Sequence, residues 1–194
     1  VILSREHIRS RKAKAIIVNA GNANACTGQR GLDDARRTVD QVSEALGIRP
    51  EDVLVASTGV IGRPLNMDLI SKAIPKLVDQ LSAGDISSAA RAIMTTDSFP
   101  KISRFDGRAG DKAYSLLGIA KGAGMIMPDM ATMLCFIMSD IFIDIEDLKN
   151  ALISSVKNSF NRITVDGDTS TNDMVLVLAN GMAENPSLSE GDSK

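Results

Sequence analysis

Short apolar runs alternate with amphipathic segments along the first half of the chain. The runs at 15–19 and 53–57 are typical of buried strands, since each is short and leads into small or polar residues. Between them, apolar residues repeat at helical spacing and predict a helix that starts at Asp33 or Asp34 and ends at Gly47. The residues that carry this spacing are Ala35, Val39, Val42 and Leu46.

Further helices are predicted between this one and the middle of the chain. Asn66 can cap the first of them, and Pro75 inside that helix is expected to kink or divide it. A shorter helix over 85–94 ends at the hydroxyl pair Thr95 and Thr96. The apolar positions of these helices are Ile70, Ile74, Leu77, Leu81, Ile86, Ala90 and Ile93.

The second half of the chain continues the alternation of strands and helices. It predicts a hairpin, a strand, an amphipathic helix and a last strand, followed by a flexible polar tail. In chain order these segments are 101–105 with 112–120, 133–139, 144–159, 174–179 and 185–194. Since there is neither an internal repeat nor an interdomain linker, the pattern indicates one domain over residues 1–194.

Composition narrows the classes of function. A chain of 194 residues that is 44% hydrophobic can bury a substantial core, and with 3% aromatic residues that core must be aliphatic. A net charge of -2 gives no electrostatic footprint for nucleic acid. The apolar stretch 133–143 is interrupted by Ser139 and Asp140 and is too short to span a bilayer. A small-molecule or protein partner is therefore favoured.

The chain's two cysteines, Cys26 and Cys135, do not make a disulfide framework in a sequence of this length. Both lie among small or apolar residues, so we expect buried free thiols. Free thiols favour a cytoplasmic location, and the first residues lack the apolar core of a signal peptide.

The segment KGAGMIMPDMATML, which begins at Lys121, carries the strongest candidate chemistry. Gly122 and Gly124 let the backbone approach a ligand closely, and Thr132 stands where a loop meets an apolar run. The hydroxyl of Thr132 can attack the carbonyl of Ala131 and form an ester by an N-to-O acyl shift. Hydrolysis of the ester would cut the chain. The freed α-amino group, with an ordinary pKa of about 7.7 to 8.0, can act as base for its own hydroxyl.

A structural role competes with this hypothesis, because threonine suits the start of a strand through its β-branched shape. Four further stretches change the balance, and they occur in a fixed order: NAGNANACTG at 19–28, ASTGVIG at 56–62, MTTDS at 94–98 and VDGDTSTND at 165–173. Together with the segment from Lys121, they resemble the ornithine acetyltransferase family, the glutamate N-acetyltransferases of arginine biosynthesis. The resemblance covers essentially the whole chain.

The resemblance implies a two-step acetyl transfer that needs no cofactor. A cut between Ala131 and Thr132 would give an α part, 1–131, and a β part, 132–194, and the αβ units would assemble into oligomers. Thr132 would accept the acetyl group of N-acetylornithine, release ornithine and pass the acetyl group to glutamate. In bifunctional members acetyl-CoA serves as a second donor. The implied fold is a mixed α/β sandwich of layered sheets and helices, like that of the N-terminal-nucleophile aminopeptidases.

The resemblance also assigns roles to residues outside the nucleophile. Thr58 and Gly59 would form the oxyanion hole, since a hydroxyl and main-chain N–H groups at the end of a strand can stabilise a tetrahedral intermediate. Lys121 would bind the substrate, as would Thr95, with Thr96 as the near alternative. Without the resemblance, each of these residues would be assigned an ordinary structural role. Thr58 and Gly59 would mark the boundary between a strand and a turn, Lys121 would be a solvated surface lysine, and Thr95 and Thr96 would be the polar end of a helix.

Other chemistries find little support in the sequence. The acidic stretch 166–173 lacks the glycine and the glutamate of an EF-hand calcium loop, so its side chains are expected to make turn hydrogen bonds near the active site. The Gly-rich stretch 21–31 matches neither a dinucleotide nor a phosphate fingerprint. With His7 as the only histidine, a Ser-His-Asp triad or a zinc site is not expected. The absence of the usual bases strengthens the case for an α-amino base.

Two alternatives stay open at this stage. One is an aminopeptidase or amidase that uses the same N-terminal nucleophile on peptides or amides. The other is a non-catalytic fragment in which Thr132 stays inside an uncut loop. The family's chains are much longer than this one, so the sequence resembles an internal fragment. An acidic active-site residue and further substrate contacts would come from outside residues 1–194.

Overall fold

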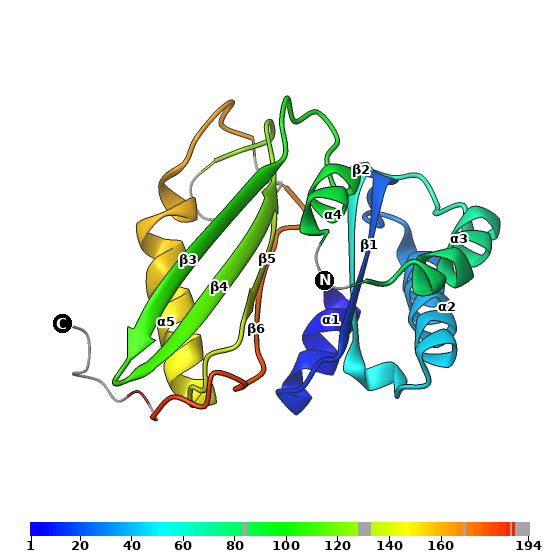
Figure 1. Cartoon of the computed structure of the whole chain (residues 1–194). Coiled ribbons are helices and arrows are strands. Elements are labelled where there is room, and N and C mark those ends of the chain that lie inside the picture. Colours follow the sequence, from blue (N-terminus) through cyan, green and yellow to red (C-terminus); the bar gives the residue numbers. More distant parts are fainter. Residues whose placement is uncertain (83–84, 128–132, 169, 187, 189–194) are drawn as a thin grey trace. The chain divides into compact units, whose positions relative to one another are not determined.

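A computed structural model describes residues 1–82, 85–127, 133–168, 170–186 and 188. Its helices and strands belong to two units, Val1–Thr95 and Thr96–Lys194 (Figure 1). Each unit combines β-strands with α-helices, which confirms the mixed α/β class. The single catalytic domain over 1–194 stays a prediction, as do the α and β parts, because the predicted cut at 131/132 lies outside the described residues.

The first unit is built on a parallel pair of strands. Strand β1 (Ala15–Asn22) pairs with β2 (Val53–Val60) in a register that runs from Ala15 opposite Val53 to Asn22 opposite Val60. The α-helices of this unit are α1 (Ile2–His7), α2 (Gly28–Leu46), α3 (Met67–Asp79) and α4 (Ile86–Ala92), and its 3₁₀ turns are η1 (Ile8–Ser10) and η2 (Pro50–Asp52).

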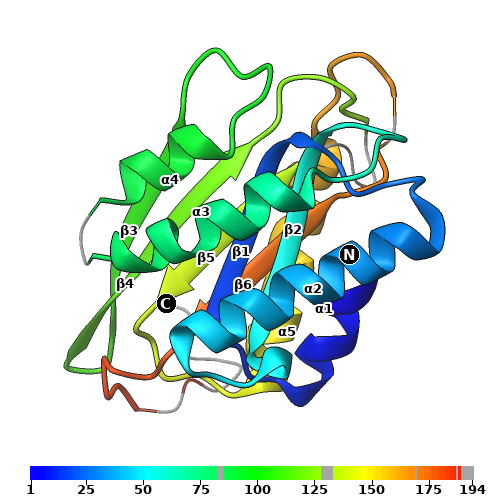
Figure 2. The ribbon, with the colours of Figure 1, turned by 90° about the vertical axis from the view of Figure 1, so that its right-hand side faces the viewer.

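The core of the first unit lies between the strand pair and its helices. Figure 2 shows α2 and α3 over one face of β1 and β2. A helix with one apolar stripe is stable only when that stripe is covered, and here the stripes of α2 and α3 meet the apolar residues of β2. The buried residues of this cluster are Leu3, Ala35, Val39, Val42, Val53 and Ile74.

Helix α2 begins earlier than predicted. It starts at Gly28, ahead of Asp33 and Asp34, while its end at Gly47, which has a φ of 65°, agrees with the prediction. The side chain of Asn24 explains the early start, because its Nδ2 donates to the carbonyl of Gly31 at 2.7 Å and ties the preceding loop to the first turn. At position 31 a Cβ would lie 2.4 Å from Asn24 Oδ1, so only glycine permits this approach.

Helix α3 confirms the predicted cap at Asn66 and corrects the expectation that Pro75 would divide the helix. Asn66 caps it, since its side chain accepts a hydrogen bond from Leu69 N at 3.2 Å. Pro75 does not divide the helix, which runs unbroken to Asp79. Of the predicted apolar face, Ile74 is buried, whereas the two last positions, Leu77 and Leu81, are exposed.

Helix α1 was not predicted. It lies along the outer edge of β2, where Ser4 Oγ donates to the carbonyl of Val55 at 2.6 Å and accepts from its N–H at 2.8 Å. His7 Nδ1 lies 2.9 Å from the carbonyl of Val53. Strand edges expose unpaired main-chain groups, and these side chains satisfy several of them. The only histidine therefore has a structural contact.

The second unit contains a four-stranded sheet in the order β3-β4-β5-β6. The predicted hairpin and both later strands are confirmed; β3 and β4 are antiparallel, β4 and β5 are antiparallel, and β5 and β6 are parallel. Figure 1 shows α5 running along one face of this sheet. The elements are β3 (Lys101–Ala109), β4 (Lys112–Lys121), β5 (Leu134–Ser139), α5 (Ile145–Asn158), η3 (Phe160–Arg162) and β6 (Met174–Ala179).

Two local expectations are corrected by burial. Asn185, at the start of the predicted flexible tail, is buried, and its side chain bonds both main-chain groups of Phe142 at 2.7 and 2.8 Å. Both thiols are free, but only Cys135 is buried, whereas Cys26 is exposed on a turn with a φ of 56°. Small neighbours in the sequence did not imply burial, because a turn with positive φ carries the Cys26 side chain outward.

Candidate active site

Lys121 is buried, in contrast to a solvated surface lysine. It is the last residue of β4, pairs with Leu134 of β5 and is only 2% exposed. Burial lowers the pKa of its ammonium group, because removal from water disfavours the charged form; the negative charges of Asp97 and Asp173 oppose this effect. A buried cation at the end of a strand is a candidate for binding an anionic group of a substrate.

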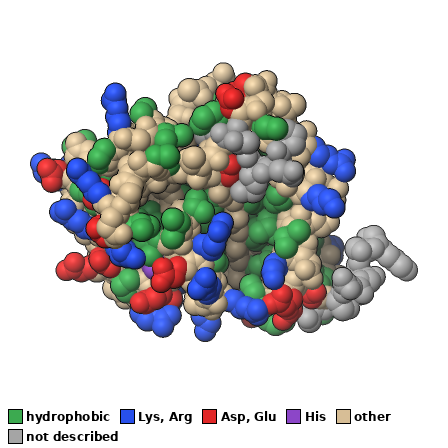
Figure 3. All heavy atoms as spheres, turned by 180° about the vertical axis from the view of Figure 1, so that it is seen from behind, with side chains coloured by type: hydrophobic (Ala, Val, Ile, Leu, Met, Phe, Trp, Pro, Cys, Tyr) green, Lys and Arg blue, Asp and Glu red, His purple; other side chains and the backbone are tan. Residues whose placement is uncertain are grey.

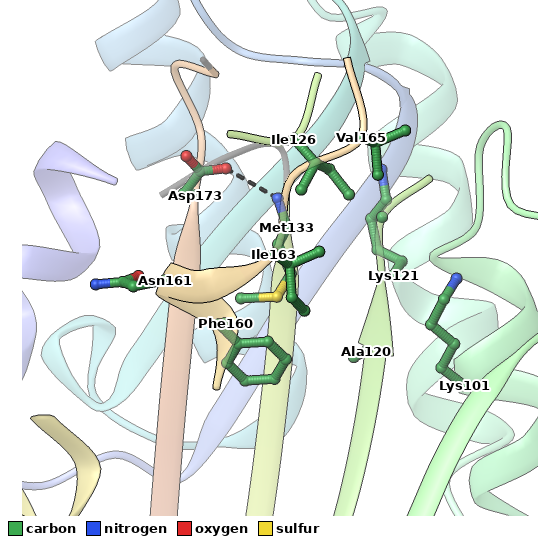
Figure 4. Close-up of a pocket in the computed structure, with 11 residues that line it drawn as sticks. Lys101, Ala120, Lys121, Ile126, Met133, Phe160, Asn161, Ile163, Val165 and Asp173 are labelled. Carbon is green, nitrogen blue, oxygen red and sulfur yellow. Dashed lines mark hydrogen bonds between the residues drawn. The ribbon is translucent and has the colours of Figure 1, made fainter. Parts of the chain in front are cut away.

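The side chain of Lys121 faces a cavity of about 200 Å³. Figure 4 shows that the cavity lies between the ends of β4 and β5 and the segment that leads to β6. Its surface is mostly apolar, with a few polar groups that could orient a ligand. The lining residues are Lys101, Ala120, Lys121, Gly122, Ile126, Met133, Phe160, Asn161, Ile163, Val165 and Asp173.

Asp97 joins Lys101, one of the two lysines of the cavity, to the main chain that follows β4. Its side chain is fully buried, and its Oδ1 accepts a hydrogen bond from Lys101 Nζ at 2.5 Å and from Gly122 N at 2.7 Å. The carboxylate therefore neutralises positive charge at the start of β3 and fixes the first residue after β4. The neighbouring Thr95 and Thr96 are exposed, so the buried member of the Thr-Thr-Asp motif is its aspartate.

Hydrogen bonds also hold the loop between β4 and β5, residues 122–133. Asp166 accepts from Met125 N at 2.6 Å and from Ile126 N at 2.8 Å. On the other side of residues 128–132, Asp173 Oδ1 accepts from Met133 N at 2.9 Å. The predicted turn hydrogen bonds of the acidic stretch are seen where Asp168 N donates to Asp166 Oδ1 and Asn172 N donates to Ser170 Oγ, each at 3.3 Å. The bonds to Met125, Ile126 and Met133 are long-range contacts that the sequence did not predict. The predicted nucleophile itself lies outside the described residues, as does Ala131.

Thr58 and Gly59 lie at the carboxyl end of β2. Thr58 is 3% exposed, and Gly59 has a φ of 127°, which residues with a side chain rarely adopt. A Cβ on Gly59 would lie 2.3 Å from the main-chain carbon of Gly21, its partner in β1. Close backbone approach therefore requires glycine here. The role of Thr58 and Gly59 as an oxyanion hole stays a prediction.

The structure brings some of the predicted residues together. Lys121 lines one cavity of the second unit together with Ile126 and Met133, which lie on either side of positions 128–132. Thr58, Gly59 and Thr95 belong to the first unit, and Thr96 begins the second. The sequence reasoning missed Asp97, Lys101, Asp166 and Asp173 as site residues. Asp97, Asp166 and Asp173 lie inside the motifs already noted, so those motifs were the available signal.

Other kinds of site find no support in the described part of the chain. Among those residues no group of three or more His, Cys, Asp or Glu side chains could hold a metal ion. No helix there is long and apolar enough to cross a bilayer. Figure 3 shows acidic and basic side chains interspersed over the face it presents, without a single basic patch.

The fold and the cavity define a mixed α/β protein with a buried lysine beside the loop that joins two strands of its sheet. The profile of the ArgJ family matches residues 1–193. The chain therefore belongs to the ArgJ family.

Individual relatives agree with this assignment. Arginine biosynthesis bifunctional protein ArgJ of Geobacter sulfurreducens is 52% identical over 98% of this chain and 49% of its own length. The protein of the same name from Symbiobacterium thermophilum is 50% identical over 100% of this chain and 48% of its own. The chain thus spans about half the length of the curated relatives it matches.

Solved structures also resemble this chain. The crystal structure of arginine biosynthesis bifunctional protein ArgJ from Bacillus halodurans has a TM-score of 0.61 and 38% identity, covering 69% of each chain. The structure of ornithine acetyltransferase complexed with ornithine from Mycobacterium tuberculosis has a TM-score of 0.56 and 31% identity, covering 66% of this chain and 68% of that one. At these identities the likeness supports the mixed α/β fold and the family together.

Proposed function

We propose that the complete protein transfers an acetyl group from N-acetylornithine to glutamate through an ester on Thr132, after a cut between Ala131 and Thr132. In the cut, Thr132 Oγ attacks the Ala131 carbonyl, the amide nitrogen leaves as the free amine, and water hydrolyses the ester. In the transfer, the same oxygen attacks the acetyl carbonyl and ornithine leaves with the proton. The amine of glutamate then attacks the acetyl ester and restores the hydroxyl.

The observation that carries this proposal is the buried Lys121 in the cavity that Met133 also lines. Met133 directly follows the proposed nucleophile in the sequence, whereas Lys121 ends the strand that leads into the same loop. An ammonium group in an apolar surrounding binds a carboxylate more strongly than it would in water. Both amino-acid substrates carry such a carboxylate. A named relative binds ornithine in its crystal structure, which supports the same substrate class.

The remaining roles follow from the same proposal. Thr58 and Gly59 would stabilise the oxyanion of each tetrahedral intermediate, and Thr95 or Thr96 would contact the substrate. No cofactor is needed, since Thr132 would supply nucleophile and base. Acetyl-CoA as a second acetyl donor is part of the proposal, because the curated relatives carry the word bifunctional in their names.

Intact mass spectrometry of the full-length protein tests the cut. We expect the wild type to yield a fragment that begins Thr-Met-Leu-Cys, the Thr132→Ala variant to stay uncut, and Thr132→Ser to cut because it keeps the hydroxyl. A wild-type protein that stays in one piece would sink the self-processing step.

An assay of the cut protein tests the transfer. Loss of N-acetylornithine should depend on glutamate and leave an acetyl adduct on the fragment that starts at Thr132 when glutamate is withheld. Release of amines from peptides without any acetyl adduct would instead support the aminopeptidase alternative. An intact chain with no adduct would support the non-catalytic one.

A further inference from the structure

Carboxylates hold the loop between β4 and β5 by its main-chain N–H groups. In the described part of that loop, Gly122 N donates to Asp97, Met125 N and Ile126 N donate to Asp166, and Met133 N donates to Asp173. Hydrogen bonds to an ionised acceptor are about twice as strong as neutral ones. Asp166 and Asp173 therefore fix the loop on both sides of residues 128–132.

The upstream attachment involves two consecutive residues. The positive φ of Met125, 54°, belongs to the backbone conformation in which successive N–H groups can point to one anion. Asp166 receives the N–H of Met125 on Oδ2 and that of Ile126 on Oδ1. In addition, Val165 N donates to the carbonyl of Ile126 at 2.8 Å. Both main-chain groups of Ile126 are thus bound, and the N–H groups of Met125 and Ile126 lower the pKa of Asp166.

The downstream attachment is equally complete. Met133 N donates to Asp173 Oδ1 at 2.9 Å, and Met174 N donates to the carbonyl of Met133 at 3.0 Å. The hydrogen bond to Asp173 therefore fixes the main-chain N–H of Met133, the residue that directly follows Thr132 in the sequence.

We propose that Asp166 and Asp173 are positioning residues for the cut at 131/132, with Asp166 holding the upstream end of the loop and Asp173 holding Met133, the residue that follows the nucleophile. This inference rests on the proposed function, in which Thr132 attacks its own chain. The attacking oxygen must come within about 3 to 3.5 Å of the carbonyl carbon, and fixed ends restrict the conformations that the loop can sample.

Asp166 and Asp173 should differ in their effect on acetyl transfer once the chain is cut. After cleavage, the upstream end of the loop is no longer bonded to Thr132, so Asp166 ceases to constrain the nucleophile. Asp173 still holds the residue that follows Thr132 and continues to orient it for acetyl transfer. The cut should depend on both carboxylates, whereas the transfer step should depend more on Asp173.

The test follows the time course of cleavage in the full-length protein by intact mass spectrometry. We expect Asp166→Ala and Asp173→Ala to slow the cut by about tenfold or more, since each loses a charge-assisted hydrogen bond. Asp166→Asn should be intermediate, because one of its oxygens becomes an N–H donor and only one acceptor remains. Asp173→Asn keeps an acceptor for its single N–H and should be affected less than Asp173→Ala.

A matched control separates positioning from general loss of stability. Asp144 also accepts a main-chain N–H, that of Glu146 at 2.8 Å, but it caps helix α5 away from the cavity. Asp144→Ala should lower the melting temperature and leave the rate of the cut unchanged. In the cut proteins, kcat for acetyl transfer should fall about tenfold more in Asp173→Ala than in Asp166→Ala.

Particular results would overturn the inference. It fails if both alanine variants cut at the wild-type rate, or if Asp144→Ala slows the cut as much at a similar loss of melting temperature. If the wild type itself yields no fragment that begins at Thr132, the proposed function fails instead. The asparagine variants preserve the shape of the side chain, so a folding defect of one alanine variant does not remove the test.

Discussion

Lys121 shows how burial changes the chemistry of a single side chain. Lys121 carries an ordinary side chain, yet at 2% exposure its ammonium group is costly unless negative charge compensates for it. Asp97 and Asp173 supply negative charge that favours its ionised form. A buried cation adds little to stability, because an apolar residue of similar shape would fill the same space without a desolvation penalty; the proposed substrate binding would give Lys121 another role.

Replacement of Lys121 by methionine tests whether this side chain serves substrate binding and not the stability of the fold. We expect Lys121→Met in the full-length protein to keep or raise stability, while the KM for N-acetylornithine rises roughly tenfold or more because the carboxylate partner is lost. Burial lowers the pKa of Lys121 from 10.5, so wild-type stability should rise as pH increases from the lowered pKa towards 10.5, and the variant should lack this rise.

Urea titrations across alkaline pH and steady-state kinetics measure both effects. Lys112→Met is the control, since Lys112 is an exposed lysine at the start of the same strand. An unchanged KM in Lys121→Met would contradict the binding role.

The backbone around Gly59 determines that only glycine fits at this position. Gly59→Ala would place a Cβ 2.4 Å from the carbonyl oxygen of Gly21 and force an unfavourable φ. We expect Gly59→Ala to lower the free energy of unfolding by roughly 3 kcal/mol or more, because backbone strain and overpacking act together. Gly21 also has a positive φ, 104°, but a Cβ at that position would meet nothing within 4 Å. Gly21→Ala should therefore lower the free energy of unfolding by only about 1 to 2 kcal/mol. Equal losses in urea unfolding would show that the close contact is unimportant.

At the scale of elements, an ion cluster fixes where the first two strands begin. Asp52 is 1% exposed and immediately precedes β2; its carboxylate lies 2.7 Å from Arg49 Nη2 and 3.3 Å from Lys14 Nζ, just before β1. The main-chain N of Lys14 also donates to the carbonyl of Asp52 at 2.7 Å. These contacts bring Ala15 opposite Val53, the first pair of the parallel register.

The protonation of Asp52 should affect stability in acid. The hydrogen bond from Arg49, followed by that from Lys14, lowers the pKa of Asp52 from its ordinary value of 3.8. Its contribution to stability is therefore complete above pH 3.8 and is lost as the pH falls through the lowered pKa. The difference in urea midpoint between wild type and Asp52→Asn should be largest near neutral pH and shrink below pH 3.8. A difference that does not change with pH would contradict this account.

Helix α3 offers a direct comparison of buried and exposed apolar residues on one element. Ile74 is 2% exposed and belongs to the core cluster, whereas Leu69 is 63% exposed. Ile74→Ala should cost roughly 2 to 5 kcal/mol, because it leaves a cavity. Leu69→Ala should change stability by no more than about 0.5 kcal/mol. Unfolding by urea measures both, and a large loss in Leu69→Ala would mean that another surface covers that residue.

At the scale of the whole molecule, the predicted cut falls between strands that pair with each other. Strand β4 lies before the cut and β5 after it, and they are hydrogen-bonded from Leu116 opposite Ser139 to Lys121 opposite Leu134. Asp166, after the cut, also binds Met125 and Ile126, before it. Cleavage should therefore leave both parts in one sheet.

Size-exclusion chromatography of the cut full-length protein tests this expectation. The two parts should elute together under native conditions and separate only in denaturant, since the sheet and its core must open first. The uncut Thr132→Ala protein provides the reference elution volume. Native separation of the parts would show that the β4–β5 pairing does not survive the cut. Assembly of αβ units into larger oligomers and a cytoplasmic location stay predictions.

The sequence by itself determined the order of the elements, because hydrophobic periodicity and turn residues act locally. It predicted every strand found among the described residues, helices α2 to α5 and the cap at Asn66, and its motifs indicated the family. It missed α1, whose short helix depends on contacts with β2, and the early start of α2, which depends on Asn24.

Only the tertiary structure decided which side chains meet around the loop between β4 and β5. The aspartates that hold this loop lie between 25 and 41 residues from their partners in the sequence, so no local pattern joins them. Lys121 is likewise buried because several strands and loops, which are distant in the sequence, surround its side chain and the cavity that it lines. Such contacts depend on the three-dimensional position of each backbone N–H, which residue spacing does not specify.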